Sequence, residues 1–98
     1  MIAKLQEEKY RKVAFNLYSC RMSRKLTQQK LSDISGVERA KISRIENYSE
    51  DFLFSTILHL AEALQVQPER LLDLSVSVPH NFEQGKVKIP KKTKGGFE

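Results

Sequence analysis

The sequence lacks several features that define large classes of protein. Its 98 residues include one cysteine and no tryptophan, and its longest uninterrupted apolar runs are only two to three residues. A single cysteine, Cys20, excludes an internal disulfide and a metal site built from several thiolates. The short apolar runs predict neither a transmembrane helix nor a secretory signal, so we expect a cytoplasmic protein with no membrane partner.

Motifs for catalysis and cofactor binding are also missing from the sequence. It contains no glycine-rich phosphate loop, no His-Glu-x-x-His pair and no nucleophile elbow. His59 is expected to be solvated and His80 to lie in a turn between Pro79 and Asn81, and two histidines with one cysteine are too few for a zinc site. We therefore expect no enzyme activity, no metal and no cofactor.

The formal net charge of +5 is distributed unevenly along the chain. Residues 9–47 hold ten basic and three acidic side chains, whereas residues 48–74 hold one basic and five acidic ones. Residues 75–98 are basic again, with five lysines and two glutamates. This asymmetry indicates a polarised surface with an anionic partner on one side, although ordinary solvated charge produces the same counts.

Apolar periodicity predicts two helices in the first part of the chain. The first spans residues 4–23, and its inward stripe contains Leu5, Tyr10, Val13, Ala14, Leu17 and Arg21. The second begins after Thr27, a good N-cap residue, and ends at Gly36, which readily adopts the left-handed conformation. In this second helix, Leu31 and Ile34 are expected to face the core.

Three further helices are predicted before residue 75. A short helix directs Ile42 and Ile45 inward, and Pro68 fits the first turn of a last helix that carries Leu71 and Leu72. Between them, with Asp51 as the expected cap, lies a helix whose inward stripe is Phe54, Ile57, Leu58, Ala61 and Leu64. Five short helices predict an all-α bundle.

The segment 75–98 has a different pattern. Residues 75–78 and 86–89 alternate polar with apolar side chains, which is a weak signal for short β-strands. Prolines and glycines interrupt the segment, and we expect disorder from about Lys91. We therefore divide the chain into a helical domain, 1–74, and a basic, partly disordered C-terminal extension, 75–98.

The second and third predicted helices have the spacing of a helix-turn-helix, in which the second helix of the pair enters the DNA major groove. Projection of that helix at 100° per residue places Ile42, Ile45 and Glu46 on the core side. Ala40, Ser43, Arg44 and Asn47 lie on the opposite side, flanked by Arg39 and Lys41. This outward face is polar and basic and has no bulky apolar side chain.

The chemistry of these positions suits double-stranded DNA. Arg44 can pair with a guanine edge through two hydrogen bonds, and the Ala40 methyl group can pack on a thymine methyl group. Thr27 and Gln28 stand at a helix N-terminus, where backbone N–H groups bind phosphate. The predicted DNA-binding residues are Thr27, Gln28, Arg39, Ala40, Lys41, Ser43, Arg44 and Asn47.

Several runs of sequence resemble the lambda-repressor-like helix-turn-helix family, of the Cro/CI or Xre type. The matching runs are LTQQKL at 26–31, SGV at 35–37, ISRIEN at 42–47, LHLAEAL at 58–64 and PERLL at 68–72. They stay in register without gaps over roughly residues 10–74, about two thirds of the chain. The resemblance implies sequence-specific operator binding as a homodimer, which represses or activates transcription; we expect a repressor.

The resemblance also implies roles for individual residues. Gln28 falls where the family has a phosphate-contacting glutamine, and Arg39, Ala40 and Arg44 fall on its base-reading positions, with Ser43 and Asn47 nearer the DNA backbone. Arg21 and Glu46 match an arginine–glutamate ion pair that ties the first helix to the reading helix, so Glu46 is expected to be structural.

Four positions depart from the family pattern. Glu38 stands where a serine or threonine cap is usual, and a carboxylate there can still cap a helix. Tyr48 replaces a glycine after the reading helix, so we expect Asn47 to adopt the left-handed conformation. Phe52 and Leu53 replace Pro-Ser, which makes the start of the fourth helix difficult to predict.

One reading helix supplies few base contacts, so we predict a two-fold dimer on a pseudo-palindrome with half-site centres about 10 bp apart. In this family the fifth helix often forms the interface, which implies Leu71, Leu72 and Leu74 here. We add the hypothesis that Val76 and Val78, with Val87 and Ile89, pair as strands across the dimer.

A chain of this size also fits two other functions. The first is the antitoxin of a toxin–antitoxin pair, in which the basic tail binds a toxin and orders upon binding. The second is a controller protein of a restriction–modification system. The genes that neighbour the coding sequence distinguish these alternatives from a free-standing repressor.

Overall fold

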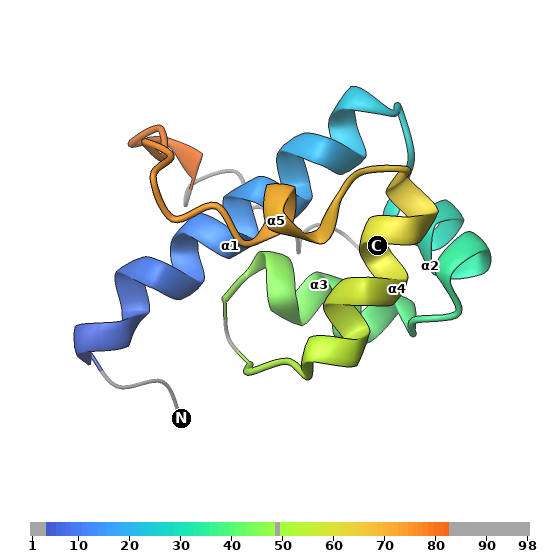
Figure 1. The fold of residues 1–98 in the computed structure, drawn as a ribbon, viewed down its shortest axis with the longest axis horizontal. Coiled ribbons are helices and arrows are strands. Elements are labelled where there is room, and N and C mark those ends of the chain that lie inside the picture. Colours follow the sequence, from blue (N-terminus) through green and yellow to red (C-terminus); the bar gives the residue numbers. More distant parts are fainter. Residues whose placement is uncertain (1–3, 49, 83–98) are drawn as a thin grey trace, which may run out of the picture.

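The computed structural model describes residues 4–48 and 50–82, which form five α-helices and no β-strand (Figure 1). The helices are α1 (Lys4–Ser23), α2 (Gln28–Ser35), α3 (Arg39–Glu46), α4 (Phe54–Leu64) and α5 (Pro68–Leu71). This confirms the predicted all-α, five-helix bundle. Within the described ranges, no helix is long and apolar enough to cross a membrane.

Helix α1 is the longest helix, and the others pack along it or on one another. Figure 1 shows α5 lying against α1, with α2, α3 and α4 grouped on one side. Helix α3 packs on both α1 and α2, and α4 packs on α2 and α5. The largest side chains of the core are fully buried and come from all five helices: Leu17, Leu31, Ile42, Ile45, Ile57, Leu60, Leu64 and Leu71.

The ends of α2 are fixed by the residues that the sequence indicated. The Thr27 side chain accepts a hydrogen bond from the backbone N–H of Lys30 at 3.0 Å, which satisfies one otherwise free donor of the first turn. At the other end Gly36 has φ +79°, and its N–H donates to the carbonyl of Ser32 at 2.9 Å. These two caps confine α2 to eight residues and set the turn that leads into α3.

Two of the predicted inward stripes are partly wrong. In α2 only Leu31 is buried, whereas Ile34 is half exposed. In α4 the buried face is Ile57, Leu60, Ala61 and Leu64, while Phe54 and Leu58 are exposed. Phe54 is the first residue of α4 and stands beyond the edge of the core, so the stripe begins one turn later and passes through Leu60 instead of Leu58.

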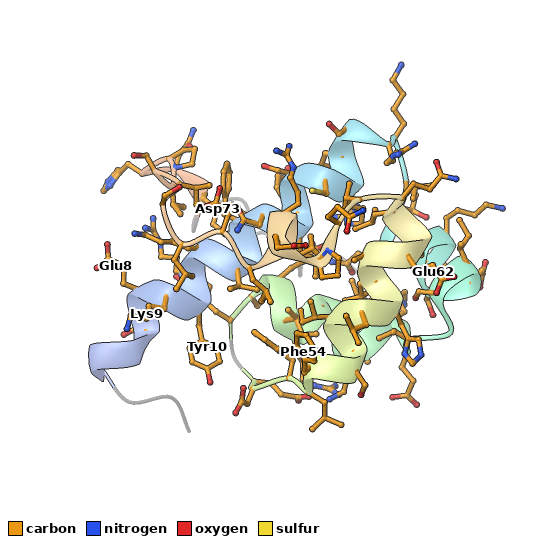
Figure 2. The ribbon with its side chains drawn as sticks, viewed as in Figure 1. Glu8, Lys9, Tyr10, Phe54, Glu62 and Asp73 are labelled. Atoms are coloured by element: carbon orange, nitrogen blue, oxygen red, sulfur yellow. The ribbon has the colours of Figure 1, made fainter. Side chains whose placement is uncertain are left out.

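The start of α4 differs from the prediction as well. Asp51 does not cap the helix: Leu53 occupies the N-cap position without a side-chain hydrogen bond. The Asp51 carboxylate instead accepts from the N–H of Phe52 at 2.8 Å and from the hydroxyl of Tyr10 at 2.9 Å. Figure 2 shows Tyr10 extending from α1 on the side of the α3–α4 loop. The two hydrogen bonds, that from Phe52 first, lower the pKa of Asp51.

The chain after α5 folds back along α1. Asn16 donates to the carbonyls of Leu71 and Asp73 at 3.0 and 2.8 Å, and Phe82 is buried with its ring edge-on to Phe15 at 5.3 Å. The strand predicted over 75–78 is absent, because these backbone groups run along α1 rather than beside another strand. The second predicted strand, 86–89, and the tail from Lys91 lie outside the described residues.

Candidate nucleic-acid interface

Helices α2 and α3 contain eight residues each and are joined by a tight turn. Gly36 reverses the chain direction, and Val37 anchors the turn because its side chain is buried in the core. The N–H of Val37 is bonded to the Ser35 hydroxyl at 3.1 Å. This arrangement directs one face of α3 into the core and leaves the other at the surface.

The outward face of α3 is formed by most of the residues that the projection selected. Arg39, Ala40 and Arg44 are exposed, and Lys41 and Ser43 are half-buried. The opposite face, made of Ile42, Ile45 and Glu46, is buried. A small side chain between exposed guanidinium groups allows close approach of a flat, anionic surface, as required for contact with base edges in a major groove.

Asn47 and Tyr48 differ from the expectation at the end of α3. Tyr48, with φ +41°, adopts the positive φ that was predicted for Asn47, whose φ is −92°. The Asn47 side chain is half-buried, and within the described ranges its oxygen is buried without a hydrogen-bond partner. Its oxygen is therefore less accessible for a DNA contact than the side chains of Arg39 and Arg44.

An ion pair between α1 and α3 fixes the orientation of the outward face. The Arg21 guanidinium donates from Nε and Nη2 to the two carboxylate oxygens of Glu46, at 2.7 and 2.9 Å. Both side chains are largely buried, at 10% and 5% exposure. Arg21 also donates to the carbonyl of Leu26 at 2.8 Å, which joins the loop before α2 to the same network. Two parallel hydrogen bonds of this kind fix both distance and angle.

Gln28 belongs to this network. Its side-chain amide donates to the Glu46 carboxylate at 3.0 Å, so α2 is bonded to α3 through the same carboxylate that binds Arg21. The sequence analysis predicted a phosphate contact for Gln28 and gave no sign of this second partner. In this arrangement the free donors at the N-terminus of α2 are backbone N–H groups of its first turn.

Sequence reasoning did not single out Glu50. This residue lies in the α3–α4 loop, and its carboxylate binds both Lys41 and Arg44 on α3. The Lys41 ammonium is 2.7 Å from one oxygen, and the Arg44 Nε binds the other. These hydrogen bonds, with that from Lys41 the stronger influence, lower the pKa of Glu50. The only sequence signal was an acidic residue soon after a basic helix.

The remaining candidates do not form a site. Cys20 is buried in the core and His59 is exposed on α4. Among residues 4–48 and 50–82, no three histidine, cysteine or acidic side chains are placed to hold a metal ion. The predicted interface residues differ in how far they are buried: Leu71 is fully buried, Leu72, Val76 and Val78 are half-buried, and Leu74 is exposed. Leu71 therefore supports the core of the protomer and has no surface to offer a second copy.

Comparison with protein families matches residues 17–71, more than half of the chain, to the helix-turn-helix family. The chain belongs to this family. In the same comparisons, no curated protein and no solved structure matches it. The helix-turn-helix match covers the region from the middle of α1 to the end of α5, which agrees with the lambda-repressor-like resemblance of the sequence. Membership indicates a DNA-binding regulator of transcription.

Proposed function

We propose that this helix-turn-helix protein is a repressor that binds a pseudo-palindromic operator as a homodimer. The observation that carries the proposal is the outward face of α3, where Arg39, Ala40 and Arg44 are exposed while Glu46 locks the helix to α1 and α2. Thr27 and the first turn of α2 supply phosphate contacts, and Lys41, Ser43 and Asn47 border the base-reading residues.

Selection of bound duplexes from a random-sequence pool tests the function. At about 150 mM salt, non-specific binding is weak, so an enriched inverted repeat reports specific readout. Arg44→Ala removes the proposed guanine contact, and we expect it to abolish the enrichment or relax it at one position of each half-site. Arg70→Ala, which removes the same charge from an exposed side chain on α5, is the matched control and should select the wild-type sequence.

If wild-type protein enriches no sequence, and binding declines smoothly with salt in all three proteins, the basic half is only an electrostatic surface. The proposal is then wrong. A single enriched half-site without an inverted repeat would retain sequence-specific binding and reject the dimer.

A second copy of the chain is proposed to bind beside α5. Leu72 and Leu74 line an apolar hollow together with Tyr10, Val13 and Phe52, and the Leu74 side chain is exposed to solvent. Val76 and Val78 continue from there along α1. An exposed leucine beside an apolar hollow supports self-association, because burial of both removes apolar surface from water.

Sedimentation equilibrium with Leu74→Asp tests the interface. We expect the dimerisation constant to weaken at least tenfold while the far-ultraviolet circular dichroism is unchanged, since Leu74 is exposed in the protomer. Deletion of residues 83–98 in a second variant separates the hollow from the proposed strand pairing of Val87 and Ile89. A dimerisation constant unchanged by both variants rejects this interface.

The antitoxin and restriction–modification alternatives depend on the basic tail and on neighbouring genes. Most of the tail lies outside the described residues, and no observation on residues 4–48 or 50–82 favours either alternative over the free-standing repressor. Co-expression of the chain with the products of the adjacent reading frames would distinguish them.

A further inference from the structure

The Glu50 carboxylate binds two of the three cations of α3 that the proposed function assigns to DNA. Its two oxygens bind different side chains, Lys41 at 2.7 Å and the Nε of Arg44. Lys41 and Glu50 are about two-thirds buried at this contact, with 31% and 30% of their side chains exposed. Lys41 and Arg44 donate to these two anionic oxygens, and the same donors can bind two oxygens of a phosphate group.

Arg39 provides the contrast within the same helix. It is exposed on the first turn of α3 and makes no ion pair with the described residues. Its charge is therefore available to any phosphate that approaches, whereas Lys41 and Arg44 must first leave Glu50. The three cations of one surface thus differ in what they give up on binding DNA.

We propose that Glu50 is an internal competitor of DNA phosphate, which binds Lys41 and Arg44 and thereby lowers the affinity of the chain for DNA. This proposal rests on the proposed function, because it concerns the same DNA-binding surface. Non-specific affinity derives from neutralised phosphates and the counterions they release. A cation that exchanges a carboxylate for a phosphate contributes little to that term, since one ion pair is lost for each that forms.

An operator offers Arg44 a different exchange. A guanine edge accepts two hydrogen bonds from one guanidinium group in a fixed geometry. Arg44 must leave Glu50 to make this contact, so the operator complex carries the full cost of breaking that ion pair. Glu50→Gln removes the cost and is therefore expected to tighten operator binding at least as much as binding to other DNA.

The test compares Glu50→Gln with wild type on a duplex of scrambled sequence. We expect the variant to bind it roughly threefold to tenfold more tightly, since two partly exposed ion pairs no longer compete. Between about 50 and 200 mM salt, the slope of log affinity against log salt concentration should also become steeper for the variant. The change should be about 0.9 for each additional phosphate neutralised, up to about 1.8. Glu62→Gln removes the same charge at the far end of α4 and is the matched control (Figure 2).

A second pair of variants assigns the effect to the contact itself. In wild type, Lys41→Gln should leave the salt slope nearly unchanged, whereas Arg39→Gln should reduce it by about 0.9. In the Glu50→Gln background, Lys41→Gln should also reduce it by about 0.9, because the lysine has become available to phosphate. An affinity and slope for Glu50→Gln equal to those of Glu62→Gln overturn the proposal.

The operator measurement separates this proposal from the proposed function. Absence of any enriched operator rejects the function, whereas the scrambled duplex alone decides whether Glu50 withholds the two cations. When an operator is found, Glu50→Gln should also bind it more tightly, by at least as large a factor as the scrambled duplex. A gain on the scrambled duplex without a gain on the operator would show that the operator complex does not require Arg44 to leave Glu50, and would overturn the proposal.

Discussion

The Arg21–Glu46 pair is the residue-scale feature on which the orientation of α3 depends. Glu46→Gln removes the charge that Arg21 faces in a largely buried site. We expect the free energy of unfolding to fall by about 3–5 kcal/mol, because a buried guanidinium group without its counter-charge remains desolvated. Urea denaturation at neutral pH measures this change.

Simultaneous replacement of both partners is the control. Arg21→Met with Glu46→Leu leaves no unpaired charge, so the double variant should be more stable than Glu46→Gln alone. If the double variant is instead less stable than Glu46→Gln, the loss comes from packing and not from an unpaired charge.

Asp51 gives a pH dependence at the same scale. The N–H of Phe52 and the hydroxyl of Tyr10 stabilise its ionised form and lower its pKa below the ordinary value of 3.8. Folding therefore gains stability from Asp51 above that value, and this gain is lost as the pH falls through the lower pKa of the folded state.

Asp51→Asn should thus be less stable than wild type at neutral pH, and the difference should shrink in the acid range below 3.8. Urea denaturation of both proteins from neutral pH down to about pH 2 measures the difference in the free energy of unfolding. Glu50 and Asp73, whose pKa values are also lowered, are present in both proteins, so their titration cancels in the comparison. A difference that stays constant over this range would show that the two hydrogen bonds do not act on the carboxylate charge.

Among the helices, the α2–α3 turn depends on one glycine. Gly36 has φ +79°, and a Cβ built there meets no atom within 4 Å, so a substitution is opposed by the backbone conformation alone. We expect Gly36→Ala to cost about 1–2 kcal/mol. Gly36→Asn should cost less, because asparagine tolerates this region better. Thermal denaturation of the three proteins gives the order, and equal losses would place the strain elsewhere.

The two ends of α2 were predictable because their causes are local, whereas the caps expected of Glu38 on α3 and of Asp51 on α4 are absent. Thr27 caps α2 through a hydrogen bond three residues away, and Gly36 ends it through its own dihedral angles. The burial of Ile34 and Phe54 was predicted wrongly, because periodicity identifies an apolar face without showing how far the neighbouring helices extend over it.

In the candidate site, the exposed residues of α3 were predictable from the sequence, whereas the partners of their side chains were not. Exposure of Arg39, Ala40 and Arg44 follows from the 3.6-residue period once Ile42 and Ile45 are assigned to the core. The partners of these side chains depend on loop conformation, which no period describes. Placement of Glu50 over α3 requires the path of the α3–α4 loop. The bond from Gln28 to Glu46 requires the docking of α2 against α3.

At the scale of the whole molecule, residues 74–82 are held to α1 by fewer contacts than the residues before them, where Asn16 binds the carbonyls of Leu71 and Asp73. The Phe82 ring lies 5.3 Å from that of Phe15 and 5.4 Å from that of Tyr18. Arg11 and Lys12 donate to the backbone carbonyls of Pro79 and Leu74, at exposed positions. Segment 74–82 is therefore expected to open without unfolding of the bundle.

Phe82→Ala should weaken this attachment. Two aromatic pairs contribute about 1–3 kcal/mol together, so the population of the opened segment should rise by about fivefold to 150-fold. Hydrogen exchange at the Phe82 position, whose N–H donates to the Pro79 carbonyl at 3.1 Å, measures the opening. The amide groups of α2 serve as the internal control, and their faster exchange would indicate global destabilisation instead.

The carboxylate shared by Arg21 and Gln28 also determines whether the reading unit can be transplanted. Residues 27–47 contain the caps, the turn and the outward face, but Glu46 within them is neutralised from α1, 25 residues away. A graft of these residues alone onto another scaffold would carry a carboxylate without its arginine and lose the link that fixes the helix angle. The smallest portable recognition module of this protein therefore extends back to Arg21 and includes the end of α1.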